Sequence, residues 1–107
     1  MNIQSKFDTD MTVRSFAYVA MQLARSPAAP GPSALYEQIL GEAEKHRSAL
    51  RLVLRDVFEM AEQGLRRQTL TKTEFHRLRD TATQTIAQAQ QAITRIATQY
   101  APHKLAA

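Results

Sequence analysis

The sequence predicts an all-α fold, in which a long antiparallel helical hairpin and a shorter N-terminal helix form a three-helix bundle within a single domain. Three observations favour this fold. Apolar residues, many of them alanine, make up 44% of the 107 residues and recur mostly at three- and four-residue steps, the period of a buried helical face. With four Phe, three Tyr and no Trp, the core has to be built from thin elements that approach closely. Three of the four prolines fall within residues 27–32, which leaves the rest of the chain almost without helix breakers.

The first helix is predicted over about residues 9–25. Thr9 or Asp10 can cap its backbone amides, and Pro27 disfavours helical geometry at the residue before it, so that the helix ends near Arg25. Its expected buried face consists of Val13, Phe16, Ala17, Ala20, Leu23 and Ala24. Residues 26–32 carry three prolines and a glycine, a composition typical of an extended linker.

The second helix is predicted over about residues 33–64, with Ser33 as its cap. Apolar side chains repeat every seven residues, which indicates a coiled-coil seam. The repeat comprises Tyr36, Ala43, Leu50 and Val57, with Ile39, His46, Val53 and Met60 three residues after each. Gly64 is expected to take the left-handed conformation that ends a helix. The alternative is that Gly64 is tolerated inside a helix that reaches Gln68.

The third helix is predicted over about residues 71–100. Thr71 and Glu74 have the spacing of a capping box, in which each side chain accepts a hydrogen bond from the other residue's backbone amide. Apolar residues then follow at helical steps as Phe75, Leu78, Ala82, Ile86, Ala89, Ile93, Ile96 and Tyr100.

The predicted lengths of the three helices do not match. The second and third helices have roughly thirty residues each, or about 45 Å, and their short connection makes them antiparallel. The first helix is only about 25 Å long. Because the linker returns the chain to the open end of the hairpin, the first helix is expected beside residues 34–50 and 85–100. The half of the hairpin near its turn is then left with two helices.

That turn-side half carries many large apolar side chains, and a two-helix hairpin cannot bury them all. The expected protein interface consists of Leu50, Val53, Leu54, Val57, Phe58, Leu65, Phe75 and Leu78. We therefore expect a homodimer that completes a four-helix bundle near the turns. The alternatives are that the first helix docks further along the hairpin or that residues 1–8 fold back over the gap.

The charge of the chain admits an anionic partner without requiring one. The net charge is +4, and basic residues gather on the second helix and around the turn. The candidate anionic-partner patch consists of Arg47, Arg51, Arg55, Arg66, Arg67, Lys72, Arg77 and Arg79. It could contact nucleic acid phosphates, or it could be a solvated surface with local ion pairs. Residues 81–94 carry no charge at all, which indicates either a face for another protein or a plain helix of high propensity.

The sequence shows no pattern of an enzyme or a metal site. It has no cysteine, and His46, His76 and His103 belong to separate regions. We expect no catalytic residues, no cofactor, no metal and no small-molecule substrate. No apolar stretch is long enough to span a membrane, and no secretion signal precedes the first helix, so that a cytoplasmic protein without membrane contact is expected.

The sequence therefore predicts a non-enzymatic helical protein-interaction module, such as an adaptor, a chaperone or a regulator, that acts as a homo-oligomer and binds another protein. The alternative is a nucleic-acid-binding accessory factor that uses the surface arginines.

Overall fold

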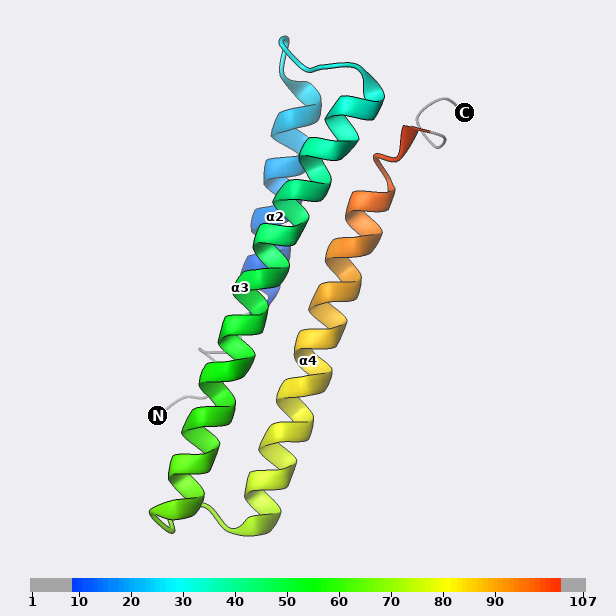
Figure 1. Cartoon of the computed structure of the whole chain (residues 1–107). Helices are drawn as coiled ribbons and strands as arrows, with labels where there is room; N and C mark the ends of the chain where they lie inside the picture. The colour runs from blue at the N-terminus through cyan, green and yellow to red at the C-terminus, as the bar shows by residue number, and fades with distance from the viewer. Residues whose placement is uncertain (1–8, 103–107) are drawn as a thin grey trace.

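Three helices account for the fold in the computed structural model, which describes residues 9–102 (Figure 1). They are α2 (Thr9–Arg25), α3 (Pro32–Arg66) and α4 (Lys72–Thr98). Helices α3 and α4 form a long antiparallel hairpin, and α2 lies along its open half (Figure 1). The molecule is a rod with extents of 56 × 21 × 16 Å. The predicted all-α three-helix bundle is confirmed.

Helix α2 packs by the face that its sequence period predicts. Phe16 and Ala20 are fully buried, and Val13, Leu23 and Ala24 are partly buried against the core. The helix ends at Arg25, and the proline-rich linker joins it to the start of α3 at the open end of the hairpin (Figure 1). In this linker the amide of Ala28 donates a hydrogen bond to the Ser26 hydroxyl.

Helix α3 begins one residue earlier than predicted, and Ser33 does not cap it. The N-cap is Gly31, which makes no side-chain hydrogen bond, and Pro32 is the first helical residue. Proline suits this position, because its φ is already helical and the amide that it lacks would have had no partner within the helix. The prediction of Ser33 as the cap is therefore wrong.

The end of α3 also differs from the prediction at Gly64, which lies inside the helix and has no positive φ. The left-handed residue is Gln68, with φ of 61°. The amide of Gln68 donates to the Leu65 carbonyl and the amide of Thr69 to the Gly64 carbonyl, the hydrogen-bond pair of a Schellman motif. The stated alternative, a helix that continues past Gly64, is closer to the structure.

The glycine at position 64 has a packing role instead. A Cβ atom built there would lie 2.8 Å from Cδ1 of Leu70, closer than carbon atoms pack. The missing side chain therefore lets the turn fold back until Leu70 rests on the last turn of α3.

Helix α4 begins as the capping box predicts. Thr71 Oγ1 accepts a hydrogen bond from the Glu74 amide at 3.1 Å, and Glu74 Oε1 accepts one from the Thr71 amide at 2.9 Å. The helix ends at Thr98, two residues before the predicted end.

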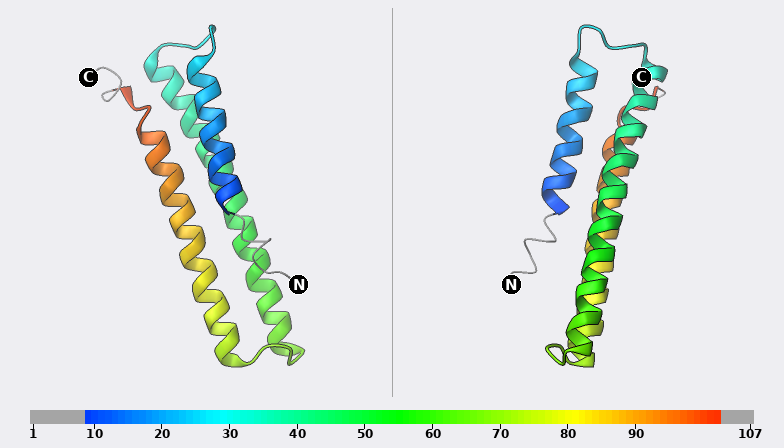
Figure 2. Two further views of the ribbon diagram at one scale, coloured as in Figure 1. Left: turned by 180° about the vertical axis from the view of Figure 1, so that it is seen from behind. Right: turned by 60° about the vertical axis from the view of Figure 1, so that its left-hand side comes forward.

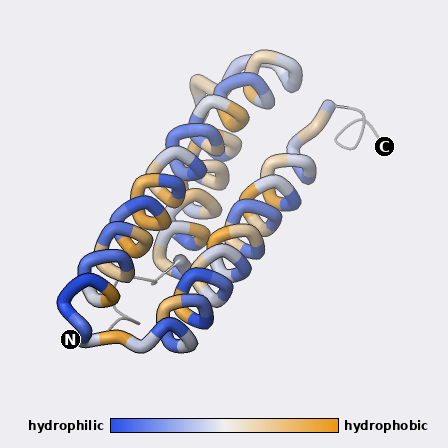
Figure 3. Tube along the Cα trace, turned by 60° about the horizontal axis from the view of Figure 1, so that its bottom comes forward, coloured by the Kyte–Doolittle hydropathy of each residue, from blue (hydrophilic) through white to orange (hydrophobic). Residues whose placement is uncertain are grey.

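The main core lies where α2 meets the hairpin, as the helix lengths predict. Apolar positions alternate with hydrophilic ones along each helix (Figure 3). The buried cluster draws on all three helices and comprises Phe16, Ala20, Leu35, Ile39, Ala43, Leu50, Ile86, Ala89, Ile93 and Ala97. Alanines on α4 allow the three backbones to approach closely.

Candidate protein interface

Helix α2 covers only the open half of the hairpin (Figure 2, right). The Phe16 and His46 rings are 5.5 Å apart, which fixes the register of α2 along α3. Since the two helices run antiparallel, Thr9 at the start of α2 lies near the level of Val53. Beyond Val53, the described helices α3 and α4 pack only against each other as far as the turn.

Three of the eight expected interface residues already lie inside the chain. Leu50, Val57 and Phe75 have exposed fractions of 0%, 2% and 8%. Leu50 belongs to the main core, and Val57 and Phe75 are buried in the half where α3 and α4 pack against each other. The expectation that these three residues form an interface is therefore corrected. Within the single chain they are already buried and expose almost no surface to a partner.

The other five expected interface residues are only partly buried, and they divide between two sides of the hairpin. His46 faces α2, and Val53 follows it by seven residues. Val53 therefore lies on the same side of α3 as His46, the side that α2 covers in the open half. Leu54, Phe58 and Leu65 lie on the opposite flank.

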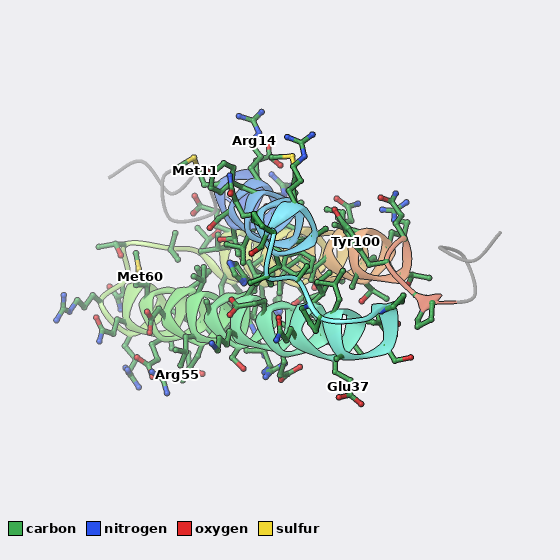
Figure 4. The ribbon with its side chains drawn as sticks, turned by 90° about the horizontal axis from the view of Figure 1, so that it is seen from above. Met11, Arg14, Glu37, Arg55, Met60 and Tyr100 are labelled. Atoms are coloured by element: carbon green, nitrogen blue, oxygen red, sulfur yellow. The ribbon has the colours of Figure 1, made fainter. Side chains whose placement is uncertain are left out.

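Met60 belongs to the α2 side as well, although the expected interface does not include it. It is partly buried and follows Val53 by seven residues. It lies on the side of α3 that faces α2, whereas Arg55 and Glu37 point away (Figure 4). Leu78 of α4 shares a helix face with Ile96, which packs against the core. We call the partly exposed surface that begins at Val53, where the contact with α2 ends, and continues over Met60 and Leu78 the step.

On the opposite flank, an arginine covers part of the apolar surface. The guanidinium carbon of Arg79 lies 4.6 Å from the centre of the Phe58 ring and 5.5 Å from that of Phe75. Both distances are within the range of cation–π attraction. Arg79 therefore shields Phe58 and is itself engaged, which weakens its case as a contact for an anion.

The arginines along α3 are also engaged, in local ion pairs. Arg51 lies 2.7 Å and Arg47 3.3 Å from carboxylate oxygens of Glu44. The hydrogen bond from Arg51, followed by the one from Arg47, lowers the pKa of the Glu44 carboxyl. Arg55 is 3.9 Å from both Asp56 and Glu59.

Near the turn, the basic side chains are more open. Arg66, Arg67 and Lys72 are exposed, and within residues 9–102 none of them has a carboxylate within 4 Å. Arg77 is exposed and interacts electrostatically with Glu74. The structure therefore separates the predicted basic patch into paired arginines on α3 and an open group at the turn.

The charge-free part of α4 borders a shallow groove of about 620 Å³ between α3 and α4. Arg47 bridges the two helices there, with Nη1 donating to the Thr94 hydroxyl at 3.3 Å. The lining residues are Arg47, Ala87, Gln90, Gln91, Thr94 and Arg95.

Two large side chains on α2 are more exposed than any residue of the expected interface. Met11 and Tyr18, seven residues apart, have exposed fractions of 62% and 59%. Met11 and Arg14 lie on the outer side of α2, away from the hairpin (Figure 4). The helical period of the sequence places Met11 and Tyr18 outside the buried face of α2. Their spacing of seven residues indicates that they share a second face of the helix.

The described helices show no metal centre and no membrane span. No three potential metal-ligating side chains cluster among residues 9–102. The ring of His46 is oriented by a hydrogen bond of 2.7 Å from Nδ1 to the Glu42 carbonyl oxygen. None of these helices combines the length and the apolar run needed to cross a bilayer.

Comparison with protein-family models, with curated proteins and with solved structures finds no match to the chain.

Proposed function

We propose that this chain is a non-enzymatic helical protein-interaction module that acts as a homodimer in the cytoplasm and presents its surface to a further protein. The observation that carries the proposal is the partly exposed apolar surface of the turn-side half. Met60 and Leu78 lie there without a third described helix above them, and Val53 lies beside them where the contact with α2 ends. Covering each such side chain contributes about 1.5–3 kcal/mol when its burial is complete.

The test is the molar mass in solution. Light scattering should give about twice 12.0 kDa for the wild-type chain, and Leu78→Asp should shift the mass toward the monomer by placing a charge in the apolar contact. Leu40→Asp is the matched control, because Leu40 is exposed on the open half. Circular dichroism checks that both variants stay helical. A wild-type monomer at millimolar concentration would contradict the proposal.

A nucleic-acid interface is the second candidate, now confined to the turn. The open positions of Arg66, Arg67 and Lys72 favour it, whereas the ion pairs of Arg47 and Arg51 with Glu44 weaken the case for the α3 part of the patch. A mobility-shift assay at low salt with the Arg66→Glu/Arg67→Glu variant as control tests it. Binding that weakens steeply with added salt and is lost in the variant would favour this candidate.

A further inference from the structure

The length of the step is close to the length of α2. Beyond the level of Val53, α3 continues for thirteen residues to Arg66, which is about 20 Å at 1.5 Å per residue. Helix α2 has 17 residues and is therefore about 25 Å long. In the open half the hairpin is covered by α2. In the turn-side half the step is long enough to accommodate most of a second helix of the length of α2.

We propose that α2 of a second copy of this chain fills the step, in an antiparallel two-fold dimer; this inference rests on the proposed homodimer. Each α2 would lie between the two hairpins. Its inner face would pack on the open half of its own hairpin, and its outer face would pack on the turn-side half of the partner's hairpin. The two α2 helices would meet near their N-terminal ends at the symmetry axis. The contact is isologous, so both steps are filled at once.

The exposed tyrosine of α2 falls at the right height for this arrangement. Tyr18 lies nine residues after Thr9, or about 14 Å along the helix axis. Measured from Val53 toward the turn, that distance reaches the level of residue 62 of the partner's α3. The contact between Arg47 and Thr94 places Leu78 near the same level on α4. Tyr18 would therefore insert between Met60 and Leu78 of the partner.

The charges near the step agree with this arrangement. Arg14 lies on the outer side of α2 and would reach the level of residue 58, close to Asp56 of the second copy. Asp56 is exposed, and its contact with Arg55 is long, at 3.9 Å. The dimer thus brings opposite charges together at the rim and large apolar side chains together at the centre.

Cysteine cross-linking tests the arrangement directly, because the chain contains no cysteine. The full-length Tyr18→Cys/Leu78→Cys variant should form a disulfide-linked dimer under mild oxidation. Within one chain the two positions are about 28 Å apart along the rod, far beyond the reach of a disulfide. Tyr18→Cys/Arg55→Cys is the control, since Arg55 points away from the α2 side of α3 (Figure 4) and should give no efficient cross-link.

A second measurement does not depend on disulfide formation. Tyr18→Asp should raise the dimer dissociation constant at least tenfold, while its helical circular dichroism stays at the wild-type level because Tyr18 is largely exposed within the chain. Leu40→Asp should leave the dissociation constant unchanged, because Leu40 is exposed on the open half, away from the step.

The outcomes separate this arrangement from the proposed function. A dimer that forms no cross-link between positions 18 and 78 and tolerates Tyr18→Asp would overturn the arrangement and leave the homodimer in place, with Leu54 and Phe58 as the next surface to test. A chain that stays monomeric at every concentration would overturn both, and its step would belong to another occupant, such as residues 1–8, which lie outside the described part of the chain.

Discussion

At Gln68 the backbone takes a conformation that glycine adopts without penalty. A residue with a side chain pays about 1–2 kcal/mol in the left-handed region. Gln68 occupies the position after the C-cap, where glycine is the most frequent residue. The Schellman hydrogen bonds around Gln68 hold this conformation.

Gln68→Gly should therefore stabilise the protein by about 1 kcal/mol, since the left-handed conformation loses its steric cost. The midpoint of thermal unfolding, followed by circular dichroism, should rise by about 4–8 °C. Gln63→Gly, at an exposed position inside α3, is the matched control and should lower stability by about 1 kcal/mol. If the melting temperature falls in both variants, glycine at position 68 does not stabilise the turn after α3.

At the level of single helices, the start of α4 is the most firmly defined. The backbone hydrogen bond from Thr71, followed by the side-chain hydrogen bond to the same residue, lowers the pKa of Glu74 below its ordinary value of 4.5. The ionised form of Glu74 is thus favoured in the folded protein. A carboxyl whose pKa is lowered on folding contributes stability above its unfolded pKa and loses that contribution as the pH falls through the folded pKa.

The melting temperature should accordingly fall as the pH is lowered from about 5 to about 3, and Glu74→Gln should reduce the slope of that fall. Glu62→Gln is the control, because Glu62 is exposed on α3 and has no ion pair within 4 Å among residues 9–102. If both variants keep the full wild-type slope, Glu74 does not contribute to the acid sensitivity.

For the whole molecule, the decisive property is that its three helices differ in length. Helix α2 encloses the core of the open half, and the turn-side half is left with residues that are neither buried nor fully exposed. A second copy with the same step supplies a helix of suitable length, so that assembly and folding become linked. Binding of a partner to the folded state alone stabilises that state by mass action.

The melting temperature of the wild-type chain should therefore rise with protein concentration, measurably between about 5 µM and about 500 µM. Tyr18→Asp should weaken this dependence, because its dimer forms only at higher concentration, while the melting temperature at the low concentration stays close to the wild-type value. A wild-type melting temperature that is constant over the range would contradict assembly through any surface.

The sequence by itself determined the helices, because helix signals are local. The capping box at Thr71, the proline-rich linker and the three- and four-residue periods are all read within a few turns of one helix. From the resulting lengths it also followed that one helix could cover only half of the hairpin. The predictions of Ser33 as a cap and of Gly64 as a left-handed residue failed, because Pro32 already suits the first helical position and Leu70 packs onto Gly64.

Only the tertiary structure decided which apolar side chains the chain covers itself and which side each remaining one faces. Leu50, Val57 and Phe75 share the sequence pattern of Val53 and Leu78, yet they are buried. The position of α2 on one side of the hairpin defines the step. It also leaves Tyr18 exposed on the outer side of α2, where we propose that it contacts the step of a second copy. Period and composition identify a helix face, but the direction from which another helix approaches that face is set by packing between segments far apart in the chain.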